Sequence, residues 1–354
     1  MEITDIQVEG YEKVVRCRDQ ASGLHALIAV HNTTLGPALG GMRMLSYASE
    51  DEALFDVLRL SKGMTFKSAV ADTGLGGGKS VIIGNPETDK TPELFRAMGQ
   101  FVESVGGKYI TAEDMNIGIP DLDIVRGETR WVTGLSRESG SSGNPSPYTA
   151  HGCLFGLRAV LEELDGSGDF TDKHVLVQGV GAVGGRLAVL LKEAGARVSI
   201  CDINATTVQA LHEEYGFEVV EDDGHHKVAC DIYSPCARGA GINDETIPEL
   251  RCRAVAGCAN NQLLDPGHAA ALRARGILYA PDYVLNAGGI INVSVELMPG
   301  GYDEAVAMEQ IGKIYDNLKR VFDISREDDV PTNEAAKRLA EQRLEAGRAE
   351  RAGA

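Results

Sequence analysis

The spacing of apolar residues in the first half of the chain alternates between helical and strand-like periods. From Ser49 to Gly63 the apolar residues gather on one helical face, which predicts an amphipathic helix that ends at Gly63. A second helix is predicted to begin at residues 91–93, because Thr-Pro-Glu offers a capping residue, a first-turn proline and an acid beside the helix N-terminus. Gly106-Gly107 ends this helix, and residues 108–112 follow as a strand.

The second half of the chain repeats this alternation after a connecting segment. Residues 139–147 are small and polar, rich in glycine, proline and serine, and are typical of a connection between domains. A chain of 354 residues with 43% apolar content is long enough to form two cores. We therefore predict a first domain at residues 1–145 and a second at 146–319, with helical residues 320–354 returning to pack on the first domain.

The most informative motif is a glycine-rich turn between a predicted strand at 173–178 and a predicted helix at 186–192. The turn has the pattern Gly-x-Gly-x-x-Gly, and the strand that follows the helix ends in Asp202. This order is typical of a dinucleotide-binding fold, in which the turn holds the pyrophosphate and the acid binds the adenosine ribose. The residues of the motif are Gly179, Val180, Gly181, Ala182, Val183 and Gly184.

Asp202 favours NAD over NADP as the cofactor, because a carboxylate repels the 2′-phosphate that distinguishes NADP. The alternatives are a glycine-rich turn without a ligand, and an aspartate that only caps the following turn at Asn204. Further strand-like segments lie at 228–233, 254–257 and 276–280 and complete a doubly wound sheet. The predicted fold class is therefore α/β, with two domains of which the second is a Rossmann-type NAD-binding domain.

Composition and charge disfavour several classes of function. The formal net charge of −18 disfavours nucleic-acid binding, which depends on clustered Lys and Arg. The seven cysteines lack a Cys-x-x-Cys pair and the eight histidines lack His-Glu-x-x-His spacing, so we expect neither a disulfide framework nor a metal site. The N-terminus lacks a signal-peptide pattern, and no apolar run reaches the ~20 residues of a membrane helix. We expect a cytoplasmic protein without membrane partners.

Lys79 ends a run of three glycines and is followed by serine, as in a phosphate-binding loop. That loop requires a further glycine where this chain has Thr73, and a helix where Val81-Ile82-Ile83 predicts a strand. The phosphate-loop hypothesis is therefore weak. An isolated lysine beside glycines at a strand, with Asp114 after the strand at 108–112, indicates a different kind of site.

Six segments of the chain resemble the Glu/Leu/Phe/Val family of amino-acid dehydrogenases, and most of all its leucine and valine dehydrogenases. They are GMTFK at 63–67, GLGGGKSVIIGNP at 74–86, YITAEDM at 109–115, GSSGNPSP at 140–147, QGVGAVG at 178–184 and APDYVLNAGGIINV at 280–293. The resemblance spans nearly the whole chain. It implies reversible, NAD-dependent oxidative deamination of an L-amino acid to a 2-oxo acid and ammonia.

The resemblance also implies roles for single residues. Lys67 would hold the substrate α-carboxylate, Lys79 would be the catalytic lysine and Asp114 would carry protons. Thr149 and Asn261 match positions that contact the nicotinamide and the substrate, and the residues from Gly179 to Gly185 would bind the pyrophosphate. The positions that match the side-chain pocket are Leu39, Ala112, Ile290 and Val293. The first domain would bind the substrate and build a homo-oligomer.

Elementary chemistry supports these roles. After a hydride leaves the substrate Cα, water attacks the resulting iminium carbon and needs a general base. A lysine with an ordinary pKa of about 10.4 is a poor base near neutral pH, but burial and a second cation, here assigned to Lys67, both lower that pKa. The glycines would admit the substrate and leave Lys79 unpaired. The alternatives are a surface lysine at a strand edge and an Asp114 that only caps a helix.

The substrate is expected to be aliphatic, because the four pocket positions are apolar and offer no partner for a second carboxylate. Burying an unpaired charge costs several kcal/mol, so glutamate is disfavoured. We predict leucine, isoleucine and valine as substrates. Asn260-Asn261 resembles aromatic amino-acid dehydrogenases as much as leucine dehydrogenases, which leaves phenylalanine or tryptophan as the alternative. A non-catalytic NAD sensor is a third hypothesis, and the presence of Lys67, Lys79 and Asp114 together argues against it.

Overall fold

The computed structural model describes residues 1–353, which fold into two units, each built on its own sheet. The first unit comprises Met1–Asn144, Val293–Asp303 and the chain from Ala340 onward. The second unit comprises Pro145–Asn292 and Glu304–Leu339. The division at Asn144/Pro145 falls within the Gly/Pro/Ser segment of the sequence.

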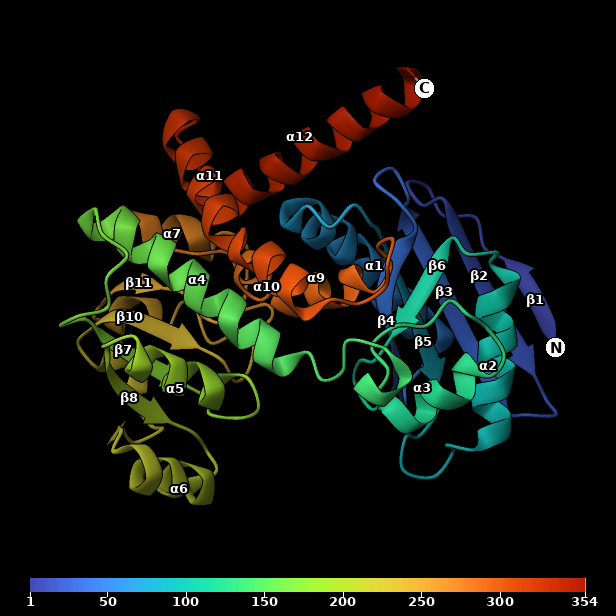
Figure 1. The fold of residues 1–354 in the computed structure, drawn as a ribbon, viewed down its shortest axis with the longest axis horizontal. Helices are drawn as coiled ribbons and strands as arrows, with labels where there is room; N and C mark the ends of the chain where they lie inside the picture. The colour runs from blue at the N-terminus through green and yellow to red at the C-terminus, as the bar shows by residue number, and fades with distance from the viewer. Residues whose placement is uncertain (354) are drawn as a thin grey trace. The chain divides into compact units, whose positions relative to one another are not determined.

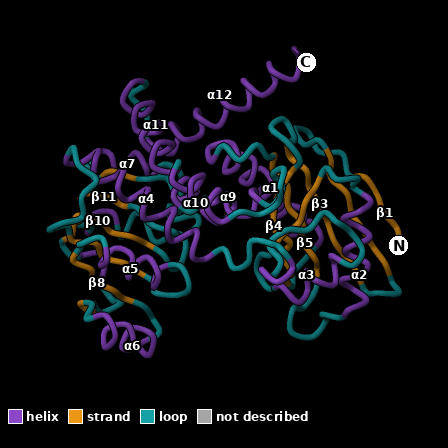
Figure 2. The backbone as a smooth tube through the Cα atoms, in the orientation of Figure 1, coloured by secondary structure: helices purple, strands orange, loops and turns teal. Residues whose placement is uncertain are grey.

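The first unit is a six-stranded mixed sheet with strand order β1-β2-β3-β5-β4-β6. The strands are β1 (Glu2–Asp5), β2 (Lys13–Asp19), β3 (Leu24–Asn32), β4 (Ala38–Leu45), β5 (Gly76–Ile83) and β6 (Tyr109–Ala112). Strand β4 runs parallel to both β5 and β6, whereas β3 pairs antiparallel with β5 and β2. Because β4 lies between β5 and β6, residues far apart in the sequence meet across it. The strands of this sheet are drawn in orange in Figure 2.

Helices cover both faces of this sheet (Figure 1). They are α1 (Glu50–Ala71), α2 (Pro92–Ser104) and α3 (Ile119–Arg126), with a short 3₁₀ turn η1 (Arg137–Ser139). Helices α2 and α3 enclose the larger apolar core with one face of the sheet. Helix α1 packs on the opposite face, where Ala53 and Val57 meet Val81 of β5.

The predicted end of the first helix at Gly63 is wrong. Helix α1 starts where the sequence predicted, with Ser49 accepting a hydrogen bond from the Glu52 N–H, but it continues through Gly63 to Ala71. A glycine inside a helix costs only about 1 kcal/mol relative to alanine. Burial of the last turn against the sheet outweighs that cost, and the helix ends where Asp72 adopts a left-handed φ of 55°. Lys67 therefore lies on a helix.

The second helix and the strand after it confirm the sequence prediction. Helix α2 begins at Pro92 with Thr91 accepting a hydrogen bond from the Leu94 N–H. It ends at Ser104, just before the left-handed Gly106. Strand β6 follows at Tyr109 and brings the chain to Asp114.

The second unit is a doubly wound parallel sheet with strand order β12-β11-β10-β7-β8-β9, which confirms the predicted Rossmann-type architecture. Its strands are β7 (His174–Gln178), β8 (Arg197–Cys201), β9 (Glu218–Val219), β10 (Cys230–Pro235), β11 (Cys252–Val255) and β12 (Leu278–Tyr279). Its first helices are α4 (Ser146–Asp165), α5 (Gly184–Glu193), α6 (Ala205–Tyr215), α7 (His268–Ala274) and α8 (Asp282–Leu285), with 3₁₀ turns η2 (His225–Lys227) and η3 (Ile247–Glu249). The short strand β9 lies at the sheet edge and is absent from the sequence prediction.

The C-terminal helices divide between the two units differently from the predicted return of residues 320–354. They are α9 (Gly288–Val295), α10 (Glu304–Gly312), α11 (Ile314–Glu327) and α12 (Thr332–Gly353). Helix α11 belongs to the second unit, because its buried face packs on α4 and Lys319 pairs with Glu162. Only the part of α12 from Ala340 onward belongs to the first unit. Among the described helices, none has the length and apolar character that crossing a bilayer requires.

Candidate active site

Lys79 lies in the middle of β5 and is 5% exposed. Side chains alternate between the two faces of a strand, so the register identifies what shares the face of Lys79. Leu39 of β4 pairs with Gly77, two residues before Lys79, and Ala112 of β6 pairs with Gly41 of β4. Lys79, Leu39 and Ala112 therefore lie on one face of the sheet, the face that α1 partly covers.

Lys79 is paired, which corrects the expectation of an unpaired amine. Its Nζ lies 2.5 Å from Oδ2 of Asp114, the residue that follows β6 by two positions. Asp114 can approach because Gly41 lies between them on β4. A Cβ on Gly41 would come within 2.6 Å of the Asp114 Cβ and of the Glu113 carbonyl oxygen. The two candidate catalytic residues thus form a single ion pair.

The three glycines before Lys79 have packing roles, which differs from the predicted role of admitting substrate. A Cβ on Gly76 would lie 2.1 Å from the Asn32 carbonyl oxygen. One on Gly77 would lie 2.1 Å from the Thr65 backbone nitrogen of α1, and one on Gly78 would meet the Tyr109 ring at 2.7 Å. Real Cβ atoms do not approach other atoms this closely, so the glycines allow α1, the end of β3 and the Tyr109 ring to pack directly against β5.

Burial and neighbouring charges shift the pKa values of both partners. Burial lowers the pKa of the Lys79 ammonium, while Asp114 opposes this shift and the positive charge of Arg43 adds to it. Burial alone would raise the pKa of the Asp114 carboxyl, but Lys79 and Arg43 outweigh it and hold that pKa below its usual range. The pair therefore combines an anionic carboxylate with an amine that gives up its proton more readily than an ordinary lysine.

Arg43, which was not among the predicted site residues, is the second cation beside Asp114. Its Nε donates to Asp114 Oδ2 at 3.0 Å, and its side chain is 15% exposed. Lys67, the second cation expected from the sequence, lies half-buried on α1. Alternation along β4 was the available signal, because Leu39, Gly41 and Arg43 fall on the same face of the strand.

The glycine-rich turn of the second unit joins β7 to α5 in the predicted manner. Gly179 has a left-handed φ of 92°, and a Cβ on it would contact Ala237 at 2.5 Å. A Cβ on Gly184 would lie 1.9 Å from the Gly179 carbonyl oxygen, so this turn is compatible only with glycine. A Cβ on Gly181 would meet nothing within 4 Å, which leaves open space at the start of α5. These features fit a pyrophosphate at a helix N-terminus.

Asp202 follows β8 and is tied to the same turn. One carboxylate oxygen accepts from the Val180 N–H at 2.8 Å, and the other accepts from the Asn204 N–H at 2.8 Å. Asn204 itself caps α6 by accepting from the Thr207 N–H at 3.3 Å. Each carboxylate oxygen has a second lone pair, so these bonds leave acceptor capacity for ribose hydroxyls. The structural role and the predicted cofactor role of Asp202 are compatible.

The remaining predicted site residues divide between the units. Val293 belongs to the first unit with Leu39 and Ala112, and it is 7% exposed. The other three, Thr149, Asn261 and Ile290, belong to the second unit. Of these, Asn261 is exposed with a left-handed φ of 53°, and Ile290 is 8% exposed. The Thr149 hydroxyl donates to the Pro145 carbonyl at 3.1 Å.

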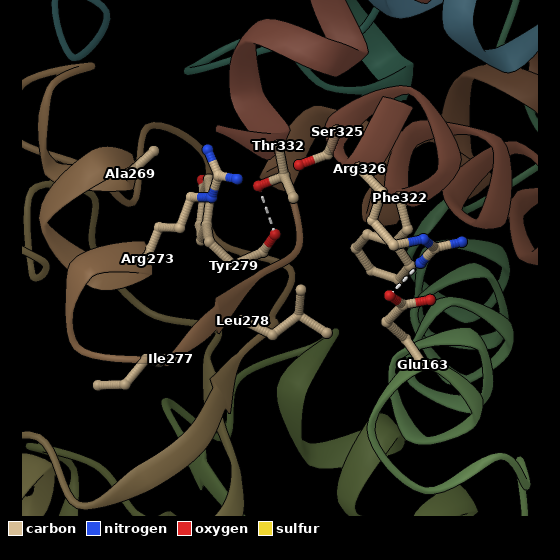
Figure 3. Close-up of a pocket in the computed structure, with 11 residues that line it drawn as sticks. Glu163, Ala269, Arg273, Ile277, Leu278, Tyr279, Phe322, Ser325, Arg326 and Thr332 are labelled. Carbon is tan, nitrogen blue, oxygen red and sulfur yellow. Dashed lines mark hydrogen bonds and ion pairs between the residues drawn. The ribbon is translucent and has the colours of Figure 1, made fainter. Parts of the chain in front are cut away.

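The second unit also contains a pocket that lies apart from the predicted site residues. A pocket of about 240 Å³ opens between Leu278, Phe322 and Thr332, with Arg273 and Arg326 at its sides (Figure 3). Both arginines are engaged, Arg273 with Asp329 and Arg326 with Glu163. None of the predicted site residues lines this pocket.

A group of possible metal ligands lies at the end of β8. Cys201, Asp222 and His225 bring ligand atoms within 4.8 Å of one another. The Nδ1 of His225 is already hydrogen-bonded to the Asp222 carbonyl. The expectation that the protein holds no metal stays a prediction.

Comparison with known proteins identifies the family. The family model described as "Glu/Leu/Phe/Val dehydrogenase, dimerisation domain" matches residues 11–131, and "Glutamate/Leucine/Phenylalanine/Valine dehydrogenase" matches residues 201–351. The chain belongs to the Glu/Leu/Phe/Val dehydrogenase family. It is 51% identical to leucine dehydrogenase of Geobacillus stearothermophilus over 95% of this chain and 91% of that protein.

Other members of the Glu/Leu/Phe/Val dehydrogenase family are nearly as similar. Phenylalanine dehydrogenase of Caldalkalibacillus thermarum (strain TA2.A1) is 47% identical over 97% of this chain and 94% of its own length. The crystal structure of L-tryptophan dehydrogenase from Nostoc punctiforme aligns with a TM-score of 0.86 and 42% identity, covering 96% of each chain. The protein is therefore an amino-acid dehydrogenase, and its relatives include enzymes named for aliphatic and for aromatic substrates.

Proposed function

We propose that the enzyme catalyses reversible, NAD-dependent oxidative deamination of branched-chain aliphatic L-amino acids to 2-oxo acids and ammonia. The observation that carries the proposal is the ion pair of buried Lys79 and half-buried Asp114, with Nζ and Oδ2 2.5 Å apart. A buried lysine whose pKa is lowered, beside an anionic carboxylate, is the arrangement expected of a general base and its proton carrier. The pair argues against a sensor that only binds NAD.

The residues of the first unit would handle the substrate and its protons. Lys67 on α1 would bind the α-carboxylate, and Asp114 would take a proton from the substrate amine. Bound NAD would supply the chemistry of hydride acceptance. Neutral Lys79 would then remove a proton from the water that attacks the iminium carbon, and a general base of this kind contributes about 10²–10⁴-fold to rate. Lys79 and Asp114 are close enough to pass the proton between them.

NAD is the cofactor that the second unit supports. The turn from Gly179 to Gly185 would bind the pyrophosphate at the N-terminus of α5, and Asp202 would accept from the ribose hydroxyls. Thr149 and Asn261 would contact the nicotinamide. The match to a family model described as a dimerisation domain supports assembly into a homo-oligomer through the first unit. We expect the enzyme to work in the cytoplasm.

Replacing Asp202 with alanine should weaken NAD binding by about 10- to 100-fold, the value of a hydrogen bond to a charged group. The preference for NAD over NADP should narrow, because the repulsion of the 2′-phosphate disappears. Fluorescence titration with NADH and NADPH measures both effects. Asp202→Asn is the control, since it keeps an acceptor for the Val180 N–H but removes the charge. Unchanged affinities in Asp202→Ala would mean that the residue only stabilises the turn.

The predicted pocket residues support a branched aliphatic substrate. Leu39 and Val293 are both nearly inaccessible, at 2% and 7% exposure, and both side chains are apolar. An apolar pocket discriminates by only about 1–3 kcal/mol per methylene, so leucine, isoleucine and valine should all react with graded efficiency. The aromatic alternative has specific support in the phenylalanine and tryptophan dehydrogenases among the relatives. A panel of L-amino acids followed by NADH formation decides between them.

In that panel, Leu39→Gly should raise the kcat/KM ratio of phenylalanine to leucine by about tenfold or more, because it opens ring-sized space. Met42→Ala is the matched control, since Met42 is buried on the same strand but belongs to the core on the opposite face. Both variants should lose stability, but only Leu39→Gly should change preference. Higher kcat/KM for phenylalanine or tryptophan than for leucine in the parent enzyme would favour the aromatic alternative.

A further inference from the structure

Arg43 links the candidate catalytic pair to a second carboxylate. Its Nε donates to Asp114 Oδ2 at 3.0 Å, and its Nη1 lies 3.2 Å from Oδ2 of Asp56 on α1. The Arg43 side chain is 15% exposed and that of Asp56 is 13% exposed, so both are largely removed from water. A buried arginine between two carboxylates has a fixed geometry, because its planar fork bonds both at once.

The outer carboxylate is itself anchored. Asp56 Oδ2 accepts from the Tyr47 hydroxyl at 2.8 Å, and Asp56 Oδ1 accepts from Arg59 at 2.8 Å. Arg59 is 48% exposed and lies at the surface. Four charges of alternating sign therefore run from the sheet to the helix, in the order Lys79, Asp114, Arg43 and Asp56.

We propose that Arg43, held in place by Asp56, is a positioning residue that orients Asp114 toward Lys79 and sets the pH range in which the enzyme works. This inference rests on the proposed role of Lys79 as the general base. Lys79 Nζ and Arg43 Nε contact the same oxygen, Oδ2 of Asp114. Arg43 thus fixes the carboxylate oxygen that Lys79 contacts, and the two cations share its negative charge.

The charges around the pair give the sign of each effect. Besides burial, Asp114 and Asp56 favour protonated Lys79 and thereby raise its pKa, whereas Arg43 lowers it. The Asp114 charge also affects other ionisable groups nearby. It contributes to the raised pKa values of Glu113, Tyr47 and Tyr109, for which burial is the largest cause. Removing Arg43 should therefore raise the Lys79 pKa, and removing the Asp56 charge should lower it.

The test is the pH dependence of kcat/KM for oxidative deamination, which reports the free enzyme's base. The rising limb should move to higher pH by about one unit in Arg43→Met, because a like charge beside Lys79 is lost. It should move to lower pH in Asp56→Asn. Arg96→Met is the control, since it removes an exposed arginine whose partner, Glu93, lies outside this network, and it should leave the limb unchanged. Opposite shifts in the two buried variants are not expected from a loss of packing alone.

If the Arg43→Met enzyme is active and its kcat/KM rises over the same pH range as in the parent enzyme, the proposal for Arg43 alone is overturned. Should that variant fail to fold, Arg43→Lys serves instead, because it keeps the charge but lacks the planar fork whose separate nitrogens bond the two carboxylates. Its limb should stay near that of the parent while kcat falls by about tenfold or more through misplacement of Asp114. An unchanged kcat in Arg43→Lys would also overturn the positioning role. A parent enzyme inactive with every L-amino acid would overturn the proposed function and this inference together.

Discussion

Replacing Lys79 with alanine should lower the rate of oxidative deamination by about 10²–10⁴-fold, the usual cost of losing a general base. NAD affinity should stay nearly unchanged, because the glycine-rich turn and Asp202 belong to the other unit. Turnover is measured from NADH absorbance, and cofactor affinity from NADH fluorescence. Asp114 should remain anionic in the variant, since Arg43 still contacts it at 3.0 Å.

Lys90→Ala is the matched control for this experiment. Lys90 also belongs to the first unit and also pairs with an aspartate, with its Nζ 2.6 Å from Asp121. It is 30% exposed and lies outside the candidate site, so its loss should leave turnover unchanged. If Lys79→Ala retained near-normal turnover, Lys79 would be a structural residue that neutralises Asp114.

Gly77→Ala should be among the most destabilising single substitutions in the first unit. The added Cβ would lie 2.1 Å from the backbone nitrogen of Thr65, and backbone cannot move aside as a flexible side chain can. Overpacking of a core typically costs about 1–3 kcal/mol, and a clash between backbone atoms falls at or above the upper end of that range. Denaturant unfolding followed by circular dichroism measures the loss.

Gly63→Ala provides the opposite case on the helix that Gly77 contacts. Gly63 lies inside α1, and a Cβ there would meet nothing within 4 Å. The substitution should stabilise the unit by about 0.5–1 kcal/mol, because alanine favours the helix over glycine. A Gly77→Ala variant of normal stability but raised KM would restore the hypothesis that the glycines make room for the substrate.

Local signals made much of the fold predictable. The cap at Thr91 and the left-handed Gly106 delimit α2 in the structure as in the sequence, because each acts within one helical turn. The glycine-rich turn was predictable for the same reason, since strand, turn, helix and acid follow one another along the chain. The end of α1 was not predictable in this way. There, a weak local penalty at Gly63 was outweighed by burial of residues that lie beyond it.

Most residues of the candidate site were predictable from the sequence, but the contacts between them were not. Lys79 and Asp114 stand out beside glycines and at a strand end, whereas their direct contact depends on β4 lying between β5 and β6. Arg43 and Asp114 are 71 positions apart, so no spacing rule links them. The same topology explains the glycines, whose neighbours come from α1, β6 and the end of β3. Side-chain contacts that depend on the order of strands in the sheet can be predicted only once that order is known.

The end of the chain supplies a part of the first unit that cannot form early. Arg343 donates to the carbonyls of Ala69 and Val70 in the last turn of α1, at 3.0 and 2.5 Å, from 274 and 273 positions further along. At the usual pace of translation, the ribosome needs on the order of tens of seconds to make the residues between them. During that time α1, the helix that bears Lys67, lacks the two hydrogen bonds from Arg343. The second unit ends at Leu339, and the last segment of the first unit begins at Ala340. Although synthesis of the first unit starts earlier, the second unit is therefore completed before it.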